Sequence, residues 1–210
     1  MNHGERELQD RLDTRERADA FYARQVLSHL NDAMRRFIGR QEMMFLATAD
    51  AGGGCDSTFR AGPPGFVRVL DEEHLSWPEL RGNGVMASLG NITENAQVGL
   101  LFLDFGETIG LHVNGTAEIV EDPDDQAGTP PGQRARLWVV TRVHEAYIHC
   151  TKHIPRMAKI PRQRGASEQP RKSEYFRPAP PRSGGGHALL RPVAGVGNDQ
   201  QPCEASDSCL

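Results

Sequence analysis

Lysine is absent from the first 150 residues of this 210-residue chain, and cysteine and long apolar runs are scarce throughout. Without lysine, that part of the chain cannot form a Schiff base. The four cysteines, Cys55, Cys150, Cys203 and Cys209, lack the CxxC spacing of a zinc ribbon or a thioredoxin-type site. No apolar stretch approaches the ~18 residues of a membrane span. These absences argue against a membrane protein and against the commonest cysteine-based sites.

The charge of the chain is unevenly distributed. Residues 1–150 carry 14 Arg and 23 Asp or Glu, whereas residues 151–210 carry 10 Lys or Arg and 5 Asp or Glu, for a total net charge of -4. An acidic body lacks the basic surface that nucleic-acid binding requires. The N-terminus also lacks the apolar segment of a secretory signal. We therefore expect a cytoplasmic protein with no nucleic-acid partner and no membrane partner.

Periodicity predicts one helix followed by a series of strands. Apolar residues at helical spacing predict one amphipathic helix over 18–38, packed on a sheet. A short helix is expected at Gly84–Leu89, between β-rich runs that are separated by Gly, Pro and Asp clusters. The runs are Met43–Ala49, Gly65–Leu70, Val98–Leu103, Ile109–Val120 and Leu137–Ile148. This order favours a mainly β fold, an antiparallel sheet or barrel with flanking helices, over a doubly wound α/β fold.

Composition divides the chain into three segments. Residues 1–40 form an N-terminal amphipathic helical segment, and residues 41–160 hold the β-rich runs. Residues 161–210 are rich in proline and glycine and basic in balance, which predicts a flexible tail. Residues 121–133, with their PDD and GTPPG sequences, are expected to form a loop between two strands.

Two arginines lie at positions where a bound anion would balance their positive charge. Arg68 interrupts an apolar strand, in which an unpaired charge is costly to bury. Arg81, Gly82 and Asn83 precede the predicted short helix, whose free N–H groups favour a phosphate. The alternative is that Arg68 faces solvent or pairs with Asp71 and that the glycines only shape a turn. The residues alone leave both interpretations open.

A third candidate lies on the strand Ile109–Val120. Alternation places Leu111 and Val113 on one face and His112 and Asn114 on the other. Two hydrogen-bonding side chains beside Gly110 could meet the polar edge of a planar ring, although a solvated face or a subunit interface would have the same pattern. No metal site is predicted, because the adjacent His149 and Cys150 would point in opposite directions on a strand.

Several of these segments together resemble one known family. They occur in the expected order over residues 45–157, which makes the match more specific than any single motif. The chain resembles the pyridoxamine 5'-phosphate oxidase-like, FMN-binding split β-barrel family at Phe45–Asp50, Arg60–Asp71, Arg81–Gly84, Ser88–Ile92, Val98–Leu103, Leu111–Gly115 and Glu145–Cys150.

The resemblance implies a six-stranded antiparallel split barrel of the FMN-binding type. It also implies a homodimer that holds FMN at the subunit interface. Matched position by position, the family places the FMN phosphate and ribityl chain near Arg68, Arg81, Gly82 and Asn83, with Ser57 and Arg60 as neighbours. The same matching places His112 and Asn114 near the flavin ring.

The expected function is that of an FMN-binding oxidoreductase that transfers electrons between a small-molecule substrate and bound flavin. The authentic oxidase has an Arg-rich C-terminal segment ending in Pro-Trp, which this chain lacks, so oxidation of pyridoxamine 5'-phosphate is not expected. The alternatives are a non-catalytic flavin-binding or ligand-storage protein, or the same fold with deazaflavin or haem. No catalytic acid or base is assigned from the sequence.

Overall fold

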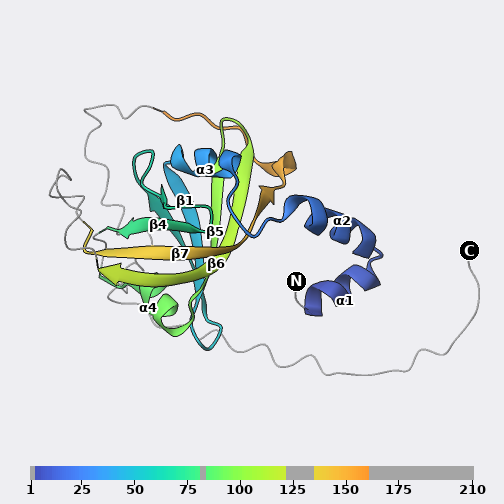
Figure 1. The fold of residues 1–210 in the computed structure, drawn as a ribbon, viewed down its shortest axis with the longest axis horizontal. Helices are drawn as coiled ribbons and strands as arrows, with labels where there is room; N and C mark the ends of the chain where they lie inside the picture. Colours follow the sequence, from blue (N-terminus) through green and yellow to red (C-terminus); the bar gives the residue numbers. More distant parts are fainter. Residues whose placement is uncertain (1–2, 81–83, 122–134, 161–210) are drawn as a thin grey trace, which may run out of the picture. The chain divides into compact units, whose positions relative to one another are not determined.

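The structure is a computed structural model that describes residues 3–80, 84–121 and 135–160 (Figure 1). Its centre is one antiparallel sheet of seven strands in the order β2-β1-β5-β6-β7-β4-β3. The helices are α1 (His3–Arg11), α2 (Arg15–Gln25), α3 (Asp32–Gly39), α4 (Ala87–Glu94) and the 3₁₀ turn η1 (Thr151–His153). The strands are β1 (Met43–Ala49), β2 (Cys55–Ala61), β3 (Arg68–Val69), β4 (His74–Glu79), β5 (Gln97–Asp104), β6 (Ile109–Glu121) and β7 (Leu137–His149).

The core is made by inward residues of these strands together with α3 and the segments that precede α3 and β3. Alternate positions of a strand point to the same face of a sheet, and β1 and β5 accordingly bury every second side chain. Burial of one such side chain contributes roughly 1.5–3 kcal/mol to folding. The largest fully buried apolar side chains are Leu30, Ile38, Met44, Leu46, Val67, Leu75, Trp77, Leu100, Phe102, Val113 and Val139. The mainly β class predicted from the sequence is confirmed.

The sheet is open and has one strand more than the six expected. Strands β2 and β3 form its two edges, since the hydrogen-bonded order begins with one and ends with the other. Strands β2 and β4 are absent from the sequence prediction because their patterns are weak. Strand β2 alternates only between exposed and half-buried residues, and β4 contains Pro78, which normally argues against a strand.

The expected single helix over 18–38 is wrong. Two helices, α2 and α3, are separated by an extended segment in which Leu27 exchanges backbone hydrogen bonds of 3.0 and 2.8 Å with Ala146 of β7. Asn31 then caps α3, because its side chain accepts a 2.9 Å hydrogen bond from the backbone N–H of Met34. Helix α3 packs on the sheet through Phe37 and Ile38, as predicted.

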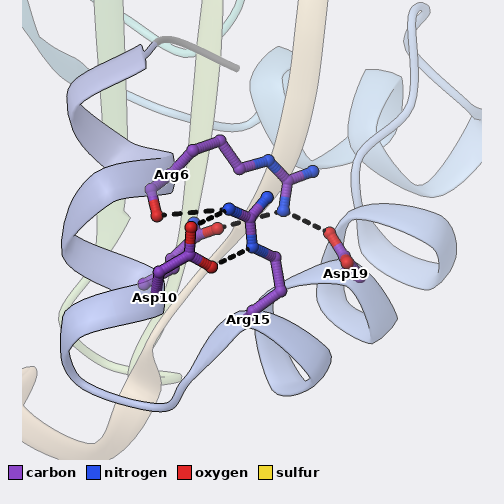
Figure 2. Close-up of polar contacts among 5 residues, drawn as sticks. Arg6, Asp10, Arg15 and Asp19 are labelled. Atoms are coloured by element: carbon purple, nitrogen blue, oxygen red, sulfur yellow. Dashed lines mark hydrogen bonds and ion pairs between the residues drawn. The ribbon is translucent and has the colours of Figure 1, made fainter.

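The α1–α2 hairpin is joined by ion pairs (Figure 2). Arg6 Nη1 lies 2.5 Å from Asp19 Oδ1, and Arg15 Nε lies 2.5 Å from Asp10 Oδ1. A hydrogen bond from Arg15 lowers the pKa of Asp10. Both helices are fully described, and neither contains a buried residue. The hairpin is therefore held by exposed charges, which salt screens.

Helix α4 begins at Ala87, three residues later than predicted, and packs against the first two strands through two polar contacts. Ser88 Oγ donates to Asp56 Oδ2 at 3.0 Å, and Asn91 Nδ2 donates to Thr48 Oγ1 at 3.0 Å. The expected tail, 161–210, and most of the expected loop, 121–133, lie outside the described residues. No helix in the described part of the chain has the length and apolar character to cross a membrane.

Candidate ligand-binding site

Two rows of side chains cross the sheet on the surface opposite the core, over β2, β1, β5, β6 and β7. We call this surface the outer face. The first row, in register from strand to strand, is Phe59, Phe45, Leu101, His112 and Tyr147. The second row, two residues away along the strands, is Ser57, Ala47, Gly99, Asn114 and Glu145. Four strand spacings make each row about 19 Å long.

The first row is apolar and aromatic. Phe59 remains 52% exposed although it is a large apolar side chain. At the other end, the ring of His112 stacks on Tyr147 with 4.8 Å between centroids and 19° between planes. A half-exposed aromatic surface of this kind is typical of a ligand site or an interface.

His112 also contacts a second imidazole. Its Nε2 lies 2.8 Å from Nδ1 of His149, so the two rings share one hydrogen bond. Burial, followed by the charge of His149, lowers the pKa of His112. A hydrogen bond between two imidazoles needs one donor and one acceptor nitrogen. The pair therefore favours a state in which at least one ring is neutral. No group of three or more metal-ligating side chains occurs in the described ranges.

The second row is flat in the middle and polar at both ends. Ala47 and Gly99 separate Ser57 from Asn114, and a Cβ at Gly99 would lie 3.4 Å from Asn114 Oδ1. Asn114 Nδ2 donates a 3.4 Å hydrogen bond to Glu145 Oε2. Small side chains between hydrogen-bonding ones leave a shallow surface that a planar ring could cover.

A β-bulge in the β6–β7 pair, with His144 of β7 as the extra residue, ends this surface. The register shifts between Asn114 and Gly115, and a Cβ at Gly115 would lie 2.0 Å from the carbonyl oxygen of Arg142. Only glycine fits such a close backbone approach.

Helix α2 adds a wall at the β6–β7 end of the outer face. The ring of Phe21 meets Tyr147 edge to face, with centroids 6.0 Å apart. A pocket of about 410 Å³ opens here, lined by Glu5, Phe21, Tyr22, Val26, Asn114, Glu145 and Tyr147. Burial raises the pKa of Tyr22, and the charge of Glu5 and a hydrogen bond to it raise it further. The Tyr22 hydroxyl is therefore a neutral donor at physiological pH.

The predicted arginines lie elsewhere. Arg60 Nη2 is 2.9 Å from Glu79 Oε2, which connects β2 with β4 across the open side of the sheet. The Nε of Arg60 is buried without a hydrogen-bond partner in the described part of the chain. Burial raises the pKa of Glu79, and the charge of Arg60 opposes this shift. Arg60 therefore has both a structural partner and an unused buried donor.

Arg68 is exposed on the short strand β3. Its guanidinium carbon lies 4.1 Å from the centre of the Trp138 ring, a cation–π contact. The sequence predicted a bound anion, solvent or Asp71 as the surroundings of Arg68, and it gave no sign of Trp138, because the tryptophan is 70 residues away in the chain. Arg81, Gly82 and Asn83 lie outside the described residues.

The structure thus brings together Ser57, His112 and Asn114 on the outer face and separates them from Arg68. The rings that Arg68 and His112 contact, Trp138 and Tyr147, both belong to β7. They are nine residues apart, which is at most about 30 Å along an extended strand. Sequence reasoning missed Tyr147, His149 and Glu145 as partners of His112 and Asn114. Alternation along Leu137–Ile148 could have placed Tyr147 and Glu145 on one face.

The fold is in class a mainly β protein built on one antiparallel sheet, and a family comparison gives the particular assignment. Residues 30–150, more than half of the chain, match the pyridoxamine 5'-phosphate oxidase family. The chain therefore belongs to the pyridoxamine 5'-phosphate oxidase family, as the sequence predicted.

Solved structures of low sequence identity are similar to the chain. HupZ of Group A Streptococcus is 19% identical, with 56% of this chain and 92% of that chain covered and a TM-score of 0.45. A putative pyridoxamine 5'-phosphate oxidase from Lactobacillus delbrueckii is 24% identical, with coverage of 58% and 95% and a TM-score of 0.45. HutZ, a haem storage protein from Vibrio cholerae, is 17% identical, with coverage of 57% and 94% and a TM-score of 0.39. No curated protein sequence matches the chain.

Proposed function

We propose that the chain is an FMN-binding oxidoreductase that works as a homodimer with flavin at the subunit interface. The observation that carries the proposal is the outer face, where the exposed Ser57 and the half-buried Asn114 flank a floor of small residues. The core does not need these groups, because Leu111 and Val113 on the opposite face supply the packing of β6. Family membership supports a cofactor of the flavin type.

The residues present fit such a cofactor. Ala47 and Gly99 leave room for a planar ring, and Ser57, His112 and Asn114 offer donors and acceptors to its polar edges. Arg68 and the unused Nε of Arg60 suit a phosphate, which forms strong charge-assisted hydrogen bonds with guanidinium groups. When bound, FMN would accept a hydride from the substrate and pass the electrons to an acceptor.

Dimerisation would explain why the predicted residues fall in two places. The two contacts are separated by nine residues of β7, at most about 30 Å along an extended strand. We infer that Arg68 of one protomer and His112 of its partner contact the same cofactor across the dimer interface. The exposed ring of Phe59 would then be covered by the second subunit.

In this arrangement the chain's own residues bind and orient. Asn114 Nδ2 would donate to the ring edge while Glu145 holds its amide in place. The His112–His149 pair would hold a proton between Nε2 and Nδ1, close to the ring. The stacked Tyr147 would exclude water from one side of His112.

The first test is reconstitution with FMN followed by gel filtration, an absorption spectrum and mass identification of the released cofactor. A two-band flavin spectrum in a dimer-sized peak is expected. A colourless protein would contradict the FMN assignment, and parallel trials with deazaflavin and haem would identify a different cofactor. Failure to reduce retained flavin with any reduced nicotinamide would favour a storage role.

Mixed dimers test the shared site. Arg68→Ala and Asn114→Ala homodimers should each lose flavin, whereas a heterodimer of the two variants should regain one intact site of its two. A heterodimer as empty as both parents would mean that the two residues act within one protomer or not at all. A dimer carrying Arg24→Ala, an exposed change on α2, is the matched control.

A further inference from the structure

Another pocket, of about 410 Å³, lies between helix α3 and the sheet. Helix α3 supplies one wall, and the start of β6 with the end of β7 supplies the other. None of its lining residues belongs to either row of the outer face. The pocket is therefore a site separate from the one that the proposed function uses.

Most of the lining of this pocket is apolar. Phe37 and Leu111 belong to the core, and Met34 and Ile109 pack against it. Ile148, paired with Leu111 across the β6–β7 ladder, remains 44% exposed although it is a large aliphatic side chain. Covering such a side chain removes apolar surface from water, which favours binding. The apolar lining therefore selects a ligand with an apolar body.

The charged residues of the lining are two arginines. Arg36 and Arg40 lie one helical turn apart, and like charges at this spacing repel each other. Arg40 is already engaged, because its Nη2 lies 2.5 Å from Glu107 Oε2 and its Nε lies 4.0 Å from Asp104 Oδ2. Its guanidinium carbon also lies 5.2 Å from the centre of the Phe37 ring. The charge of Arg40 is therefore balanced within the protein.

Arg36 differs from Arg40 in this respect. It is exposed, and it has no ion-pair partner among the described residues. The carboxylate of Asp32, one turn before it, binds Arg35 instead and acts on Arg36 only at longer range. A bound anion would give Arg36 a partner and offset its repulsion from Arg40.

We propose that this pocket binds a small apolar carboxylate, an aliphatic or aromatic acid whose body covers Ile148 and whose carboxylate pairs with Arg36. Guanidinium and carboxylate groups form strong charge-assisted hydrogen bonds. The volume of the pocket is within the range of small-molecule sites. The lining contains no Asp or Glu that would repel the carboxylate.

Two other classes of ligand fit this pocket less well. A cation would meet two guanidinium groups and no carboxylate in the lining, and like charges repel. An inorganic anion could pair with Arg36 but would leave the apolar surface of Ile148 in contact with water. An apolar carboxylate satisfies both parts of the lining at once.

The test is a titration of the full chain, followed by the NMR signals of its methyl groups. The two probes are naphthalene-2-carboxylate and naphthalene-2-carboxamide, which have the same shape and differ in charge. The carboxylate should bind saturably at one site per protomer and should shift the methyl signals of Met34, Ile109, Leu111 and Ile148. The amide should bind about fivefold more weakly, a difference expected for a partly exposed ion pair.

Two variants separate the roles of charge and apolar surface. Arg36→Gln should lower the affinity for the carboxylate to that for the amide and leave the affinity for the amide unchanged. Ile148→Thr, which keeps the branched side chain that suits a strand, should weaken both probes by several-fold. Both residues are exposed, so neither change disturbs the core. Arg17→Gln, an exposed change on α2, is the matched control and should affect neither probe.

Several results would overturn the proposal. Equal affinities of wild type for the two probes, or an unchanged affinity of Arg36→Gln for the carboxylate, would show that Arg36 does not bind the acid. Absence of saturable binding, or shifts confined to methyl groups outside the lining, would show that the pocket is not the site.

The same titration of FMN-loaded protein separates this inference from the proposed function, on which it does not rest. The carboxylate should bind equally well with and without FMN. Binding of the carboxylate by a protein that retains no FMN would contradict only the proposed function. Displacement of FMN by the carboxylate would place both ligands in one site and would overturn the inference.

Discussion

The imidazoles of His112 and His149, on neighbouring strands, approach to 2.8 Å between Nε2 and Nδ1. His112 has a pKa below its ordinary value of 6.5, first because of burial and second because of His149. The folded protein therefore binds fewer protons here than the unfolded chain does. The contribution of the neutral His112 ring to the free energy of unfolding is present above pH 6.5. It is lost as the pH falls through the lowered pKa of His112 in the folded protein.

His112→Gln should remove part of this pH dependence. Wild-type melting temperatures should fall between pH 7.5 and pH 5, and the variant should lose less over the same range. Thermal unfolding at four or five pH values measures the difference. His153→Gln, an exposed change in η1, should follow the wild type. Parallel curves for His112→Gln and wild type would show that the pair does not titrate as described.

The Arg60–Glu79 pair should stabilise the contact between β2 and β4. Arg60→Ala leaves a carboxylate at 14% side-chain exposure without its cation, which should cost about 1–3 kcal/mol at neutral pH. Burial raises the pKa of Glu79, so this penalty should shrink as the pH falls and the carboxyl becomes neutral. Denaturant unfolding at pH 7 and pH 5 measures it. In a double-mutant cycle with Glu79→Gln, additive losses would exclude a direct interaction.

Gly115→Ala should destabilise the protein severely, because its Cβ would meet the Arg142 carbonyl oxygen at 2.0 Å. Displacing that backbone should cost about 1–3 kcal/mol or more. The matched control is Gly39→Ala at the end of α3, where a Cβ has no neighbour within 4 Å. It should be neutral or slightly stabilising, since alanine favours the helix. Equal melting temperatures of the two variants would argue against the bulge.

Gly99→Val should separate stability from cofactor binding. A Cβ at this position makes only ordinary contacts, and valine suits a strand, so the melting temperature should be unchanged or higher. The added methyl groups would rise from the floor between Ala47 and Asn114. Retention of FMN on gel filtration should therefore fall at least tenfold. Full retention of flavin would place the ring somewhere other than the outer face.

The Arg68→Ala/Arg81→Ala double variant should lose FMN while its fold remains intact. Each charge-assisted bond to a phosphate contributes roughly 1.5–3 kcal/mol, so affinity should fall by several kcal/mol in total. The absorbance ratio of flavin to protein after gel filtration measures the loss. Arg17→Ala/Arg24→Ala, two exposed changes on α2, is the matched control. A double variant that keeps its flavin would refute the predicted phosphate site.

The parts of the fold that the sequence predicted are those with local patterns. Strand β1 was placed correctly at Met43–Ala49, and alternation placed Leu111 and Val113 on one face and His112 and Asn114 on the other, as the structure has them. The break between α2 and α3 was missed, because it depends on the pairing of Leu27 with the distant Ala146. Apolar spacing alone continues through that break.

The candidate site was predicted only in part, because pairing between strands that are distant in the sequence brings its residues together. Ser57 and Asn114 are aligned only through β1 and β5, and no spacing along the chain reveals such a row. The contacts of Arg60 with Glu79 and of Arg68 with Trp138 also join segments that are distant in the sequence. Tertiary partners of this kind decide what a charged side chain can bind, and they become visible only in the folded sheet.

The absence of buried side chains from α1 and α2 has a kinetic consequence for the pocket that these helices line beside Tyr147. Its floor belongs to strands that open only when the whole sheet unfolds, whereas its wall can detach at little cost in free energy. Amide hydrogens of α1 and α2 should then exchange much faster than those of β6 and β7. Entry and exit of a ligand would depend on this detachment, and salt that screens the Arg6–Asp19 and Arg15–Asp10 pairs would speed both.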